Sequence, residues 1–63
     1  MKREIDPTYA SLTSAYRNLA QLWRIRADAA MEQRDAYGTH EAVKRAVECE
    51  NAARRIEIRH MLP

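Results

Sequence analysis

The sequence predicts an all-α fold, an antiparallel helical hairpin formed by one 63-residue domain. Three observations predict it. One glycine and two prolines stand among many Ala, Arg, Glu, Leu and Met residues, a composition that favours helices. Apolar residues recur at intervals of four and three, so no stretch shows the alternation of a strand. The only glycine, Gly38, divides the chain into two such patterns.

The first helix is expected over about residues 7–37, after a frayed arm over residues 1–5. Asp6 can accept a backbone hydrogen bond as the N-cap, and Pro7 fits the first helical turn because its missing N–H is not needed there. The apolar stripe of this helix comprises Ile5, Tyr9, Leu12, Tyr16, Leu19 and Trp23. Beyond Trp23 the stripe continues through Ala27, Ala30, Met31 and Tyr37.

Gly38 follows the end of this stripe and is expected to close the helix in a left-handed conformation. The turn then lies at residues 38–39, and Thr39 caps a second helix over about residues 40–61. The inner face of this second helix is small and apolar, and it comprises Ala42, Ala46, Cys49, Ala53, Ile56 and His60. Small residues at this spacing allow two helices to approach closely.

Counting outward from this turn sets His60 opposite Tyr16, so the second helix would not cover Ile5, Tyr9 and Leu12. A second copy packed antiparallel would cover this overhang and form a four-helix bundle with two-fold symmetry. We therefore expect a homo-oligomer, with a dimer favoured. Its interface would consist of Ile5, Tyr9, Leu12, Tyr16, Leu19 and Trp23. A monomer, or a protein that offers this strip to a different partner, is the alternative.

The sequence predicts no catalytic, metal or cofactor site, and the protein is expected not to be an enzyme. Cys49 lies between two glutamates in sequence and on the small face of its helix, which favours a buried core residue over a nucleophile. His40 and His60 lie at opposite ends of one helix, about 30 Å apart. No pair of His or Cys residues has the spacing of metal ligands.

Charge is distributed unevenly along the chain. Residues 27–53 hold six acidic and three basic side chains, whereas the remainder holds eight basic and three acidic ones. One interpretation of this pattern is helix-dipole complementarity with pairs within one helix, such as Arg24 with Asp28. The functional interpretation is a basic open end that contacts an acidic partner or a phosphate backbone through Arg17, Arg54, Arg55 and Arg59. Arg26 falls on a core position and must either reach solvent or pair with a carboxylate across the dimer.

The net charge of +2 is too balanced to indicate nucleic acid by itself, so nucleic-acid binding is an alternative rather than the leading function. No apolar segment approaches the roughly 20 residues that span a bilayer, and Met1–Glu4 lacks the core of a signal peptide. A lone cysteine suits a reducing compartment. A cytoplasmic protein without membrane contact is expected.

The stretch Glu4-Ile-Asp-Pro-Thr-Tyr-Ala-Ser-Leu-Thr-Ser-Ala-Tyr16, with the chain length and the expected hairpin, resembles the small accessory proteins encoded in the early leftward region of lambda-like phages. The resemblance implies a non-enzymatic regulator in the host cytoplasm that binds a host or phage protein and adjusts host physiology or the choice between lytic growth and lysogeny. It supplies no site residues. The alternatives are a nucleic-acid binder that uses the basic open end and a purely structural oligomer.

Overall fold

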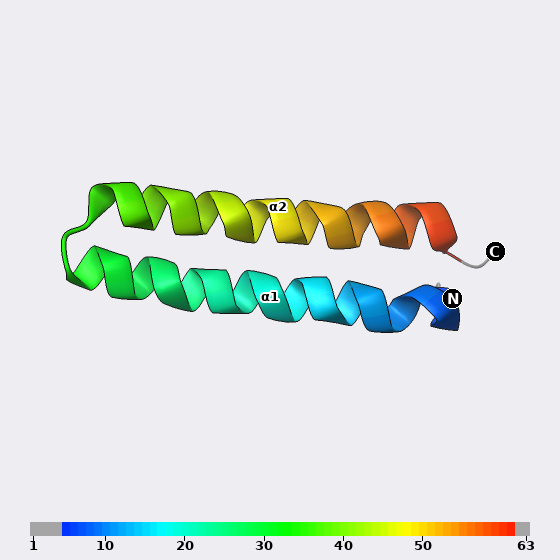
Figure 1. Cartoon of the computed structure of the whole chain (residues 1–63). Coiled ribbons are helices and arrows are strands. Elements are labelled where there is room, and N and C mark those ends of the chain that lie inside the picture. Colours follow the sequence, from blue (N-terminus) through cyan, green and yellow to red (C-terminus); the bar gives the residue numbers. More distant parts are fainter. Residues whose placement is uncertain (1–4, 62–63) are drawn as a thin grey trace, which may run out of the picture.

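The computed structural model describes residues 5–61 and confirms an all-helical hairpin. Helix α1 spans Pro7–Glu32 and helix α2 spans Ala36–His60. Figure 1 shows the two helices side by side and antiparallel, with the start of α1 and the end of α2 at the same end of a rod. The principal extents of the chain are 46 × 20 × 14 Å. The radius of gyration is 14.3 Å, against about 10.6 Å for a compact domain of this length.

The start of α1 lies where the sequence predicts it. The Asp6 carboxylate accepts a hydrogen bond from the Thr8 backbone N–H at 2.9 Å, and Pro7 occupies the first turn. This hydrogen bond from Thr8 lowers the pKa of Asp6, and the nearby His60 adds a smaller effect in the same direction. The expected frayed arm lies outside the described residues at positions 1–4. At Ile5 the chain is paired, since Ile5 forms an antiparallel bridge with Met61.

The predicted turn at residues 38–39 is wrong, because α1 ends at Glu32 and the turn occupies residues 33–35. Arg34, not the glycine, adopts the left-handed backbone, with φ of 58°. Asp35 is the N-cap of α2, and its carboxylate accepts a hydrogen bond from the Gly38 backbone N–H at 2.9 Å. An aspartate cap can therefore start a helix before the glycine that was expected to end one.

Gly38 has a different role, inside the first turn of α2. A Cβ atom at this position would lie 2.3 Å from an Oδ atom of Asp35, so glycine leaves the space that the capping carboxylate fills. Thr39 does not cap the helix. Its hydroxyl donates to the Asp35 carbonyl at 2.8 Å, one turn back along the chain.

The earlier turn changes the register of the hairpin. The Tyr9 ring stacks on His60 with ring centroids 3.5 Å apart, and the Asp6 N–H donates to the His60 carbonyl at 3.0 Å. His60 thus lies beside Tyr9 and not beside Tyr16, its expected neighbour. The difference of seven residues corresponds to about 10.5 Å along α1. The expected overhang is wrong, because α2 reaches Tyr9.

The seam between the helices consists of small side chains. The buried residues are Thr13, Ala20 and Ala27 from α1 and Ala42, Ala46, Cys49 and Ala53 from α2. The predicted small face of α2 is confirmed, with Ile56 and His60 half-buried at its end. On α1 the buried Thr13 and Ala20 each follow a residue of the predicted stripe, Leu12 and Leu19, which are 46% and 43% exposed. Ala27 belongs to the predicted stripe and is buried. No large side chain of the described residues is fully buried.

Candidate interaction surface

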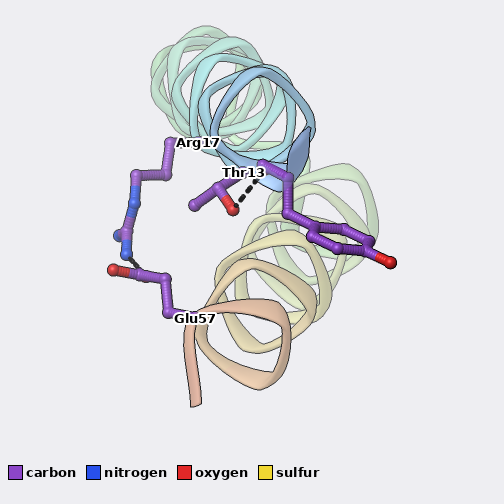
Figure 2. A network of polar contacts seen from close by, with 4 residues as sticks. Thr13, Arg17 and Glu57 are labelled. Atoms are coloured by element: carbon purple, nitrogen blue, oxygen red, sulfur yellow. Dashed lines mark hydrogen bonds and ion pairs between the residues drawn. The ribbon is translucent and has the colours of Figure 1, made fainter. Parts of the chain in front are cut away.

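One edge of the hairpin carries cross-helix ion pairs. Figure 2 shows Arg17 of α1 and Glu57 of α2 reaching toward each other along this edge, while Thr13 points between the helices. The Thr13 hydroxyl donates to the Tyr9 carbonyl at 3.0 Å, so this buried polar group is satisfied within its own helix. Arg17 was expected to belong to a free basic end. Its pairing with Glu57 leaves it less available for an external anion.

Arg24 and Glu50 form the second ion pair of this polar edge. Two hydrogen bonds of 2.6 and 3.2 Å join the guanidinium to the carboxylate. These hydrogen bonds, which Arg24 donates and Glu50 accepts, lower the pKa of Glu50 and raise the pKa of Arg24. The expected partner of Arg24 was Asp28 in the same helix. A cross-helix partner is reached because helical side chains lean toward the N-terminus of their own helix, which brings antiparallel Arg and Glu side chains together.

The opposite edge of the hairpin is apolar. Leu12 and Leu19 precede Arg17 and Arg24 by five residues, which places them about 140° away around α1. Tyr16 and Trp23 follow these leucines by four residues and are half-buried beside the seam. We define the apolar edge as Leu12, Tyr16, Leu19 and Trp23 of α1 with Ala52 and Ile56 of α2.

A pocket of about 310 Å³ joins the two helices on the apolar edge near the open end. Its lining combines apolar and basic side chains, and comprises Tyr16, Ala52, Arg55, Ile56, Arg59 and His60. The structure thus brings together two of the four arginines that were expected at a basic end, Arg55 and Arg59. Arg54 is exposed and does not line the pocket.

Arg26 also lies on this edge. Its guanidinium carbon is 5.1 Å from the centroid of the Trp23 ring, a cation–π contact that contributes about 0.5–1 kcal/mol at an exposed site. Arg26 is exposed in the single hairpin, as both of its predicted explanations require. The contact itself was missed, although the spacing of three residues on a helix indicates neighbouring side chains.

A second pocket, of about 530 Å³, lies beside the turn. It is lined by Met31, Arg34, Asp35, Ala36, Thr39, His40 and Val43. Met31 is 62% exposed although it carries a large apolar side chain. This turn pocket shares no lining residue with the apolar edge.

No protein-family model, curated protein or solved structure matches the chain. Within residues 5–61, neither helix has an apolar stretch long enough to cross a membrane. The same part of the chain holds no group of three or more His, Cys, Asp and Glu side chains that could bind a metal ion. Cys49 is a free, buried thiol on the small face of α2.

The predicted interface residues separate into two groups. Leu12, Tyr16, Leu19 and Trp23 share the apolar edge, in the arrangement described above. Ile5 and Tyr9 instead contact the end of α2 through Met61 and His60. Thr13 and Ala20 were missed as seam residues. Their signal was a small residue every seven positions, which continues to Ala27.

Proposed function

We propose that this protein is a non-enzymatic binding protein that acts as a homodimer, in which two hairpins form a four-helix bundle. The observation that carries this proposal is the seam of small side chains beside an edge of large exposed ones. The largest buried residues of the described hairpin are Cys49 and Thr13, and the others are alanines. Such a hairpin has little hydrophobic core of its own. A neighbour on the apolar edge supplies the missing contacts for Leu12, Leu19 and Trp23.

The exposed area supports the same association. The chain exposes 5300 Å², whereas a compact monomer of 7.3 kDa is expected to expose about 4,200 Å². The excess of roughly 1,100 Å² is larger than the roughly 800 Å² that each partner buries in a standard protein interface. One face of a rod of these dimensions can therefore supply the area that a stable dimer needs.

Cys49 and His60, two side chains that could take part in catalysis, have structural roles, which supports a binding function over a catalytic one. Cys49 is buried in the seam and His60 stacks on Tyr9. The proposal that the binding partner is a host or phage protein, in the host cytoplasm, rests on the resemblance of residues 4–16 to phage accessory proteins. The turn pocket is the surface we assign to that second protein, because it lies away from the apolar edge and exposes Met31.

Nucleic-acid binding through the basic open end is less favoured, because Arg17 is held by Glu57. Titration against DNA and RNA at two salt concentrations distinguishes this function, since phosphate contacts weaken steeply with salt. We expect no salt-dependent binding. Tight binding at low salt that disappears at high salt would support the nucleic-acid function instead.

Sedimentation equilibrium at micromolar concentration tests the dimer. We expect twice the 7.3 kDa mass of the chain for the natural protein and for Asn18→Asp, which adds a charge on the exposed outer surface. Leu19→Asp adds the same charge on the apolar edge and should shift the mass to that of one chain, because an unpaired carboxylate is costly to bury. A mass near 7.3 kDa for the natural protein would defeat the proposal.

Affinity capture from a bacterial lysate tests the assignment of the turn pocket. Met31→Asp should abolish the capture of a protein partner without changing the dimer mass, and Asn18→Asp should leave both unchanged. Equal capture by all three proteins would exclude the turn pocket as the binding surface.

A further inference from the structure

We propose that the two copies pair head to tail across the apolar edge, with the two-fold axis passing between Tyr16 and Leu19 of each α1. This inference rests on the proposed dimer and specifies its geometry. The basic open end of one hairpin then lies beside the turn half of the other, residues 18–51, which hold six acidic and five basic side chains. The acidic partner of the basic end is therefore a second copy of this chain.

The spacing of the apolar edge supports this axis. Leu12, Tyr16, Leu19 and Trp23 are separated by four, three and four residues, so the stripe reads the same in both directions. When two such stripes run antiparallel, Leu12 meets the partner's Trp23 and Tyr16 meets the partner's Leu19. Each large side chain then has an apolar neighbour. The midpoint of the stripe, between residues 17 and 18, fixes the axis.

The charges on α2 are arranged around the same level. The stack of Tyr9 on His60 sets the register of the two helices, so that equal steps inward place Tyr16 level with Ala53. The two-fold axis then crosses α2 between residues 51 and 52. Glu48 and Arg55 lie equally far on either side of this level and share one helix face, since they are seven residues apart. The head-to-tail dimer therefore has two symmetry-related contacts between Arg55 and the partner's Glu48, whose carboxylate also lies 3.8 Å from the exposed Arg45 guanidinium of its own helix.

The other two-fold arrangement places both turns at the same end. It brings the two basic open ends together, where residues 5–17 and 52–61 of each chain hold four basic and two acidic side chains, although the helices still alternate in direction. Like charges directly opposed are unfavourable, so the charge distribution favours the head-to-tail dimer. The apolar stripe alone does not distinguish the two arrangements, and the charges decide between them.

Charge reversal tests this geometry. Arg55→Glu and Glu48→Arg each replace two attractive ion pairs by two repulsive pairs of like charge. Each should therefore raise the Kd of the dimer by roughly tenfold. The double variant restores both pairs in reversed order and should recover most of the affinity. Arg54→Glu is the matched control, because it changes the same charge one residue away from the interface face and should leave the Kd nearly unchanged.

Cross-linking supplies an independent measurement in a Cys49→Ala background. Leu12→Cys and Trp23→Cys variants are made separately, and a short bismaleimide is added to each alone and to their mixture. In the head-to-tail dimer Leu12 lies about 16 Å along the axis from the partner's Leu12, so only the mixture should give a cross-linked dimer.

Two outcomes overturn the geometry and are distinguishable from failure of the proposed function. Equal effects of Arg55→Glu and Arg54→Glu in a protein that sediments as a dimer refute the head-to-tail pairing alone. Cross-linking of Leu12→Cys by itself, with no further product in the mixture, refutes it as well. A natural protein that sediments as a monomer refutes the homodimer, and this inference with it.

Discussion

Replacing Gly38 by alanine, with and without Asp35, tests the position of the turn. Alanine is favoured over glycine in a helix by up to about 1 kcal/mol. At Gly38 its Cβ would also collide with the capping carboxylate, which lies 2.3 Å from the Cβ position, and loss of an N-cap costs about 1 kcal/mol. The two effects oppose each other, so Gly38→Ala should leave the free energy of unfolding nearly unchanged in the natural background.

The Asp35→Ala background removes the collision, and there Gly38→Ala should stabilise the protein by up to about 1 kcal/mol. The double-mutant cycle thus predicts a coupling energy of about 1 kcal/mol between the two sites, equivalent to roughly 4–8 °C in Tm for a chain of this size. Thermal unfolding followed by circular dichroism measures it, with every protein at the same concentration because self-association stabilises the folded state. If Gly38 closed the first helix in a left-handed conformation, alanine would destabilise both backgrounds equally. A coupling energy near zero would therefore refute the turn at residues 33–35.

Three further predictions concern the seam, the register and the pH dependence. Ala46→Leu should lower the free energy of unfolding, measured in urea, by about 1–3 kcal/mol, because Ala46 is fully buried. The control Val47→Leu, on the exposed side of α2, should change it by less than about 0.5 kcal/mol. Tyr9→Leu removes the stack on His60 but keeps an apolar side chain, and should cost about 0.5–1.5 kcal/mol; no change would argue against the register. The folded-state pKa of Glu50 is lowered, so its stabilising effect is present above the ordinary glutamate pKa and is lost as the pH falls through the lowered value. Unfolding measured across this acid range should show less pH dependence for Glu50→Gln than for the natural protein.

The local signals at the start of α1 and along α2 predict the structure well. Asp6 and Pro7 form a short-range pattern whose physics does not depend on the rest of the chain, and α1 begins as expected. The small face of α2 is likewise determined by spacing within one helix. These features require no knowledge of which residues pair across the hairpin.

The turn was misplaced because glycine is the residue that most readily adopts a left-handed backbone. The chain instead places Arg34 in that conformation, an unfavourable choice for a residue with a side chain, and begins α2 at the Asp35 cap. Aspartate is a stronger N-cap than threonine, so Asp35 could have been preferred to Thr39 from the sequence. Gly38 therefore makes room for the capping carboxylate of Asp35 and takes no part in the turn.

The predicted register is wrong by one heptad for a physical reason. The small and large residues of both helices recur every seven positions, and the true pairing differs from the predicted one by seven residues. A shift of one heptad returns the same faces to the seam, so the pairing of small residues with small ones cannot identify the register. The stack of Tyr9 on His60 breaks this degeneracy because it occurs only at the end of the helices.

The seam explains why the large residues lie at an edge. Alanine methyl groups at Ala20, Ala27, Ala46 and Ala53 let the helix backbones approach closely, and at that distance a leucine does not fit between them. The bulky stripe of α1 is thereby turned to one side, where Leu12 and Leu19 remain about half exposed. Larger residues in the seam would separate the helices and divide the stripe between two edges. We therefore interpret the alanine seam as the feature that places Leu12, Tyr16, Leu19 and Trp23 together on one edge, and the proposed dimer as its consequence.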